Sequence, residues 1–204
     1  MESLSDFEFR ARRAPGTKQL IEELLPLATL LKYLESPGLT PRCRYQGPDK
    51  TPDAEIHFSG RRVERRQVPA EVFVEITTAV SPLDHLRREA LNQDGAVYGG
   101  PGIWTVGSRN KGTRRVISEA VAQYGGTHIR NAVSTLQERI TQKSAHTYRS
   151  PCILLVALQP EKAIRPTEWS QIVGGAASAV VPGRFAGVYI ATWDQGIVLP
   201  VAAV

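Results

Sequence analysis

The 204-residue chain has few cysteines and no long apolar run. Its two thiols, Cys43 and Cys152, lie far apart in the sequence and lack the spacing of a zinc site, which excludes a disulfide framework and a Cys-ligated metal. No stretch reaches the roughly 18 apolar residues of a membrane span. The first residues, MESLSDFEFRARR, place acids before any apolar segment, unlike a secretory signal. We therefore expect a cytoplasmic protein without a membrane partner.

Signatures of nucleotide binding and of serine catalysis are missing as well. The sequence contains no G-x-S-x-G motif, and the glycine-rich residues 99–102 lack the lysine and serine of a phosphate-binding loop. The four histidines are scattered and form no sequence cluster with cysteine that would favour zinc. The candidate chemistry therefore lies with the carboxylates and the basic residues.

Arginine dominates the basic residues, with 19 of the 25 Lys and Arg, and the net charge is +5. Because a guanidinium binds phosphate through two parallel hydrogen bonds, this excess of arginine favours a phosphate-bearing partner. We expect this partner to be nucleic acid, and DNA in particular. The alternative is an arginine-rich surface that only keeps the protein in solution. The basic residues expected to contact nucleic acid are Arg61, Arg62, Arg65, Arg66, Arg87, Arg88, Arg109, Lys111, Arg114 and Arg115.

Length and a 42% hydrophobic content predict a single domain over residues 1–204, with residues 1–16 as an N-terminal arm and residues 161–204 as a C-terminal extension. Pro26 is expected to kink the first helix, and the proline-rich residues 40–52 to form a loop. Apolar periodicity predicts helices at 17–35, 83–91, 127–144 and 167–180, and a further helix of undefined start that leads to residue 125. It predicts strands at 54–58, 71–79, 103–106, 151–158, 186–191 and 197–201. Strands before and after helices predict an α/β fold with a mixed central sheet flanked by helices.

Two carboxylates stand out against this pattern. Asp53 directly precedes the strand at 54–58, and Glu75 lies inside the apolar strand at 71–79. If these strands pair, Asp53 approaches Glu75, and the two carboxylates together with a main-chain carbonyl such as that of Ile76 are suitable ligands for Mg²⁺ or Mn²⁺. The alternative is that Asp53 belongs to a Pro-Asp turn and that Glu75 pairs with an arginine.

The same residues resemble a known superfamily. Pro52-Asp53, a gap of about twenty residues, and then the strand residues Val74-Glu75-Ile76-Thr77 are similar to the motif of PD-(D/E)XK, or restriction-endonuclease-like, nucleases. The order of elements over residues 17–160 is also similar: a helix, a hairpin with the motif, a helix and a buried strand. The resemblance implies a restriction-endonuclease-like fold, with Asp53 and Glu75 as catalytic metal ligands for Mg²⁺ (or Mn²⁺) in a metal-dependent nuclease acting on phosphodiester bonds of DNA.

The motif departs from the family at its third member, because Thr77 stands where the lysine is expected. The resemblance implies that another residue supplies this cation, and Lys143, near the end of the helix at 127–144, is our candidate catalytic lysine; the alternative is an exposed lysine that stabilises the helix end. Lys111 is a second candidate. The resemblance also implies a further carboxylate from the first helix, either Glu22 or Glu23.

Two other classes of function stay open at this point. Thr77 favours a catalytically inactive protein of the nuclease fold that binds nucleic acid or a protein partner. The apolar end of the chain, residues 198–204, favours a structural or assembly protein that uses its last strand at an interface, as in a homodimer.

Overall fold

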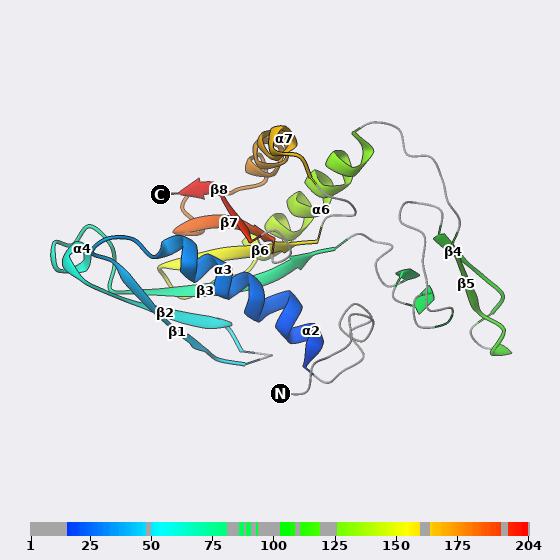
Figure 1. Ribbon diagram of the computed structural model, residues 1–204, viewed down its shortest axis with the longest axis horizontal. Helices are drawn as coiled ribbons and strands as arrows, with labels where there is room; N and C mark the ends of the chain where they lie inside the picture. Colours follow the sequence, from blue (N-terminus) through cyan, green and yellow to red (C-terminus); the bar gives the residue numbers. More distant parts are fainter. Residues whose placement is uncertain are drawn as a thin grey trace.

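The computed structural model describes residues 16–47, 50–80, 86–87, 89–90, 93, 103–108, 111–118, 126–159, 164–192 and 196–203. Its centre is a six-stranded sheet in the order β1-β2-β3-β6-β7-β8. The strands of this sheet are β1 (Thr40–Tyr45), β2 (Ala54–Ser59), β3 (Glu71–Ala79), β6 (Cys152–Leu158), β7 (Gly187–Thr192) and β8 (Ile197–Ala203). A second sheet pairs β4 (Ile103–Val106) with β5 (Arg115–Ser118), and this hairpin stands apart from the main sheet (Figure 1).

The six-stranded sheet is mixed, as the sequence predicts. β1, β2 and β3 pair antiparallel, β3, β6 and β7 run parallel, and β8 returns antiparallel to β7. The parallel connections contain α6 (Thr127–Ser144) and α7 (Pro166–Ala177), because parallel neighbours need a long crossover. The remaining helical elements are α2 (Thr17–Gln19), the π-helical turn η1 (Leu20–Leu24), α3 (Leu25–Leu34) and the single turn α4 (Arg61–Glu64).

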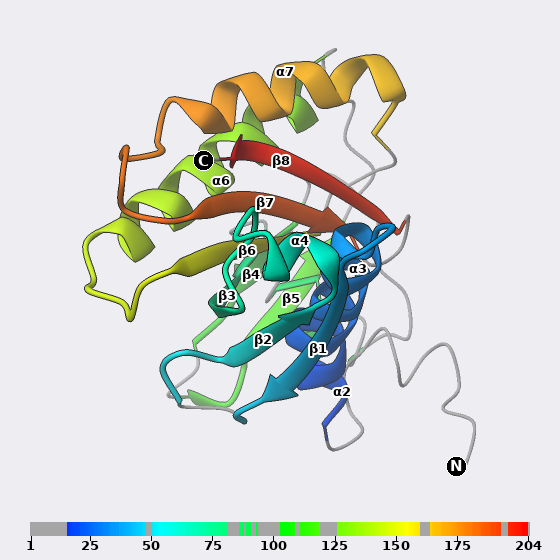
Figure 2. The ribbon, with the colours of Figure 1, turned by 90° about the vertical axis from the view of Figure 1, so that its left-hand side faces the viewer.

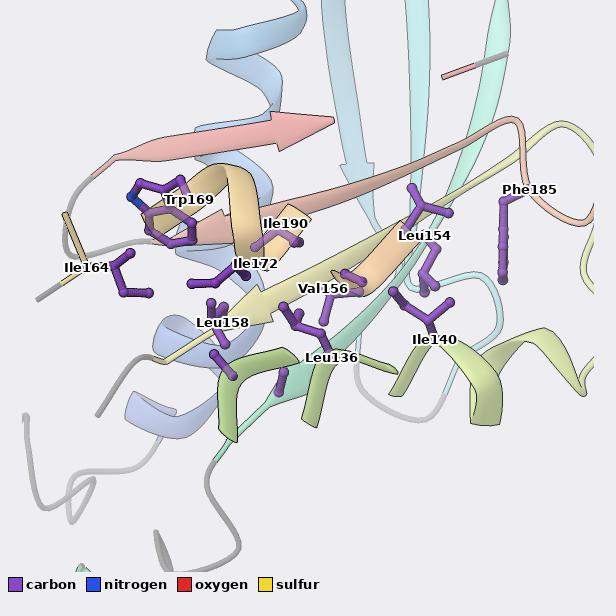
Figure 3. Packing of buried hydrophobic residues seen from close by; sticks show 14 of the residues in the cluster. Leu136, Ile140, Leu154, Val156, Leu158, Ile164, Trp169, Ile172, Phe185 and Ile190 are labelled. Carbon is purple, nitrogen blue, oxygen red and sulfur yellow. The ribbon is translucent and has the colours of Figure 1, made fainter. Parts of the chain in front are cut away.

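Helices cover both faces of the sheet, so β6 is buried throughout its length. On one face α3 packs over the side chains of Val74, Ile76 and Leu155. On the other face α6 and α7 pack over the alternate residues of the same strands (Figure 2). Figure 3 shows Leu136 and Ile140 of α6 lying against β6. The continuous apolar run of β6 is thus explained by burial on two faces, as expected for a central parallel strand.

Two elements differ from the sequence prediction. Thr40–Tyr45, expected within a loop, is the edge strand β1. Its apolar side chains Cys43 and Tyr45 pack toward the α3 face, and an edge position tolerates Pro41 because the outer N–H of an edge strand needs no partner. Arg115–Ser118, expected before or within a helix, is the strand β5, because its apolar residue Val116 packs with Ile103 of β4.

Other expectations fall partly outside the described residues. Of the helix expected at 83–91, residues 86, 87, 89 and 90 are described and are helical, while most of the glycine-rich segment 92–102 lies outside the described residues. The residues after 161 add β7 and β8 to the same sheet and contribute α7, which packs over one face of it. None of the helices among the described residues combines the length and apolar character needed to cross a membrane.

Candidate metal-binding site

The carboxylates of Asp53 and Glu75 belong to the region where β2 stops pairing with β3. The two strands pair antiparallel as expected, and their ladder ends with Ala54 opposite Val74. Beyond that point the carboxylate of Asp53 replaces a strand partner, since its Oδ2 accepts a hydrogen bond of 2.6 Å from the backbone N–H of Ile76. We expected the main chain of Ile76 to offer its carbonyl; the described contact to Asp53 is made by its N–H.

Glu75 faces α6 and meets Lys143. Side chains alternate along β3, so Phe73, Glu75 and Thr77 lie on the α6 face, and Phe73 packs in the cluster under that helix. Nζ of Lys143, in the last turn of α6, donates a hydrogen bond of 2.6 Å to Oε1 of Glu75. Lys143 is therefore not the fully exposed helix-end lysine of the alternative interpretation. The sequence-expected trio of Asp53, Glu75 and Lys143 comes together in the fold.

One oxygen of Glu75 has no partner. The residue is only 5% exposed, and its Oε2 is buried without a hydrogen bond among the described residues. A buried carboxylate oxygen without a donor carries a desolvation penalty of roughly 1–3 kcal/mol or more. Such an orphaned acceptor next to a second carboxylate is an arrangement that a bound cation would satisfy.

The protonation of Asp53 reflects its burial first and the nearby negative charges second. The pKa of this carboxyl is raised to about 6, mainly by burial; Glu75 and Glu23 contribute to the rise, whereas the Ile76 N–H and Lys143 oppose it. Three carboxylates and one ammonium therefore share this part of the molecule, with a formal charge of −2 when all are ionised. One divalent cation would neutralise it.

Two further groups lie in the electrostatic field of these acids. Burial, with Glu75 next in importance, raises the pKa of the Tyr148 phenol well above its usual range. Burial and the nearby Glu75 likewise raise the pKa of the Cys152 thiol to about 12. Both groups are therefore neutral at physiological pH and add no negative charge to the site.

The end of α6 that carries Lys143 is fixed by Arg184. Nε of Arg184 donates a hydrogen bond of 2.8 Å to the carbonyl of Ser144, and its Nη2 donates to the carbonyl of His146. The last carbonyls of a helix have no partner within the helix, so an arginine from the segment before β7 satisfies them.

Removing this cap gives a first testable expectation. Arg184→Ala should lower the free energy of unfolding by about 1–2 kcal/mol because it frees two carbonyls at the end of α6. Urea denaturation followed by circular dichroism measures the change. Arg130→Ala, which removes an exposed arginine from the first turn of α6, is the matched control and should change stability by no more than about 0.5 kcal/mol. Equal stability of the two variants would contradict the capping role.

The predicted basic residues that the structure describes are spread over several elements. The residues from Arg61 to Arg66 follow β2 at its far end, whereas Asp53 precedes its start, so about 20 Å of strand separates them. Arg114 pairs with Glu89 at 2.8 Å. Lys111 and Arg115 belong to the β4–β5 hairpin and are exposed, Arg87 lies in the short helical segment, and Arg88 and Arg109 lie outside the described residues.

An arginine that the sequence did not point to lies near the site. The guanidinium of Arg149 stacks 4.4 Å above the ring centroid of Phe73. Phe73 precedes Glu75 by two residues in β3 and lies on the same face of that strand. Its side chain is exposed, and no carboxylate among the described residues pairs with it. A guanidinium held on an aromatic ring with unpaired donors is well suited to contact a phosphate. Its loop position, after α6, gave no signal in the sequence.

A second group with metal-ligating side chains occurs further back on β2 and β3. Glu55, His57 and Glu71 offer ligand atoms within 4.8 Å of one another. The two imidazole nitrogens lie 3.9 Å and 3.8 Å from the carboxylates of Glu55 and Glu71, too far for hydrogen bonds. The side chain of His57 is 52% exposed. The group is more open to water than the Glu75 site and has no orphaned buried atom among the described residues.

Comparison with known proteins adds no relative. No protein-family model, no curated protein sequence and no solved structure matches this chain.

Proposed function

We propose that this protein is a metal-dependent nuclease that hydrolyses phosphodiester bonds of DNA, with a restriction-endonuclease-like arrangement of its sheet and helices. One observation carries the proposal: the carboxylate of Glu75 is buried near Asp53 and binds Lys143 through one oxygen, and its second oxygen has no hydrogen-bond partner in the part of the chain that the structure describes. The order helix, β1–β2–β3, α6 and β6 is also the order that the PD-(D/E)XK resemblance implies.

The donor set suits Mg²⁺ or Mn²⁺. Carboxylate oxygens are the preferred ligands of these hard cations, and Oε2 of Glu75 together with Oδ1 of Asp53 would hold one. A divalent ion bound there would lower the pKa of a water molecule and stabilise charge on a phosphoryl oxygen. The Ile76 N–H orients Asp53 and Lys143 orients Glu75.

Lys143 replaces the missing cation of the motif. Thr77 has no charge, but the ammonium of Lys143 reaches the same carboxylate from the neighbouring helix. Its ammonium orients the Glu75 carboxylate, and its other N–H bonds would donate to an attacking water or to a phosphate oxygen. Arg149 supplies a further cation on the same face of β3 for binding the nucleic-acid backbone.

The proposal is tested by cleavage of plasmid and linear DNA with Mg²⁺, with Mn²⁺ and with a chelator. We expect wild-type cleavage only with the metal, and a loss of about 10²–10³-fold in Glu75→Gln. Glu71→Gln, which removes a carboxylate from the same face of the same strand, is the matched control and should keep the wild-type rate. Metal-independent cleavage, or full activity of Glu75→Gln, would contradict the assignment.

A catalytically inactive nucleic-acid-binding protein is the second candidate. Two observations favour it. The ammonium of Lys143 pairs with one oxygen of the buried Glu75 carboxylate without any metal. Thr77 stands where the nuclease motif has its lysine. Such a protein would bind DNA with an affinity that falls with salt and would cleave none of it with any metal.

A structural or homodimeric role through the C-terminal strand has less support. β8 is an edge strand whose Val198, Leu199 and Val201 pack against the two cores of the same chain. Pro200, opposite Tyr189 at an irregularity in the ladder, is the kind of residue that discourages further strand addition at an edge.

A further inference from the structure

The first helix changes its winding beside the site. In η1 the backbone N–H of Leu25 bonds to the carbonyl of Leu20, five residues back. Pro26 follows and has no N–H, so it cannot bond to the carbonyl of Glu22; the hydroxyl of Thr78 in β3 lies 3.5 Å from that carbonyl and donates to it. Single π-helical turns occur frequently at functional sites. This one is anchored on β3, two residues beyond Ile76.

Within this turn, the carboxylate of Glu23 is held by a short hydrogen-bond chain. The phenolic O–H of Tyr45 donates to Oε2 of Glu23, and the side-chain amide of Gln19 donates to the same phenolic oxygen at 2.7 Å. The three residues come from α2, η1 and β1, so the chain exists only in the folded protein. Because the Gln19 amide donates to the phenolic oxygen, the phenolic proton is directed toward Glu23.

The chain brings Glu23 close to Asp53. Tyr45 lies directly opposite Ala54 in the β1–β2 ladder, one residue from Asp53. Glu23 also contributes to the raised pKa of Asp53, as a nearby negative charge does. The phenolic O–H of Tyr45 is a donor held between Gln19 and Glu23, on the strand that pairs with the start of β2. The hydroxyl of Tyr45 thus holds the carboxylate of Glu23 near those of Asp53 and Glu75, which repel it.

We propose that Tyr45 is a positioning residue that, with Gln19, fixes Glu23 as part of the carboxylate cluster and thereby sets the affinity of that cluster for a divalent cation. The inference rests on the proposed function. Tyr45 engages one oxygen of Glu23, and the hydrogen bonds among the described residues leave the other oxygen to a cation. Outer partners of this kind orient ligands before the ion arrives, and their removal typically weakens metal binding about 10–100-fold.

The probe is Mn²⁺ itself, titrated into the full chain by calorimetry or electron paramagnetic resonance, with cleavage followed in parallel as a function of Mn²⁺ concentration. Tyr45→Phe keeps the ring in the core and removes only the hydroxyl. We expect it to bind Mn²⁺ about 10–100-fold more weakly, to need correspondingly more Mn²⁺ for half-maximal cleavage, and to reach a near-wild-type rate at saturation. Gln19→Ala should show a smaller shift in the same direction.

Two controls make the test specific. Tyr33→Phe removes a hydroxyl from an exposed tyrosine of α3 and should leave Mn²⁺ affinity unchanged. Glu23→Gln should weaken Mn²⁺ binding at least as much as Tyr45→Phe. Wild-type affinity in Tyr45→Phe or in Glu23→Gln would overturn the inference while leaving the proposed function in place, provided that Glu75→Gln still abolishes cleavage. Failure of the wild-type protein to bind Mn²⁺ would instead overturn both.

Discussion

Lys143→Met is expected to abolish DNA cleavage and to destabilise the protein. The substitution leaves Glu75 as a buried carboxylate, 5% exposed, without its only hydrogen-bond donor among the described residues. Breaking a buried ion pair by removing one partner typically costs about 3–5 kcal/mol. Because the side chain of Lys143 retains 28% exposure, we expect about 2–4 kcal/mol here. Urea denaturation without metal measures the loss.

A double-mutant cycle separates the pair from other effects of the substitution. Glu75→Gln combined with Lys143→Met should recover most of the stability, since no unpaired charge is then buried. Lys143→Arg keeps a cation and should retain the larger part of the stability, although its planar geometry differs. The interpretation is wrong if Lys143→Met unfolds at the same urea concentration as the wild-type protein, or if the double variant is no more stable than the single one.

Asp53→Asn is expected to move activity and stability in opposite directions. Cleavage should fall by about 10³-fold or more, because a neutral amide is a poor ligand for Mg²⁺. Stability without metal should increase at pH 8. The pKa of Asp53 is raised to about 6 in the folded protein from 3.8, mainly by burial, so ionisation of this group opposes folding. The amide oxygen of asparagine can still accept the hydrogen bond from Ile76.

The sign of the pH dependence follows from this shift. A carboxyl with a raised pKa binds its proton more tightly in the folded state, so its favourable contribution is complete below pH 3.8 and is lost as the pH rises through about 6. The full shift corresponds to roughly 3 kcal/mol, which partial exposure reduces to about 1–2 kcal/mol. The wild-type protein should therefore lose stability relative to Asp53→Asn between pH 4 and pH 7, and parallel curves for the two proteins would refute this account. Mg²⁺ should stabilise only the wild type.

The strands with strong apolar patterns could be predicted from the sequence. The alternation in Ala54–Ser59 and the unbroken apolar run of Cys152–Leu158 each reflect how many faces of the strand are buried. β1 could not be recognised, because Pro41, Arg42 and Arg44 suit an edge strand whose outer face is exposed. β5 has only Val116 fully buried, which is too little for a period to be read.

The residues of the site also differ in how far the sequence predicts them. Asp53 and Glu75 are predicted because Glu75 is a carboxylate inside an apolar strand and needs a partner, and the expected pairing of the two strands is present. Lys143 followed from the resemblance and from the place of its helix, not from any local pattern. The sequence does not predict Tyr45 and Gln19, because the hydrogen bonds of Tyr45 to Gln19 and to Glu23 join β1 to the first helix and depend on the complete tertiary structure.

The chain positions of the acidic cluster have a consequence for folding. Glu23, Asp53, Glu75 and Lys143 are contributed by the first helix, the start of β2, the middle of β3 and the end of α6, so the residues that assemble the site extend over most of the polypeptide. Contacts between residues so distant in sequence form late, after local hairpins and helices. A nascent or partly unfolded chain therefore has the two carboxylates of the hairpin without the lysine that orients them. Under the proposed function, the chain would therefore hydrolyse DNA only once this fold is complete.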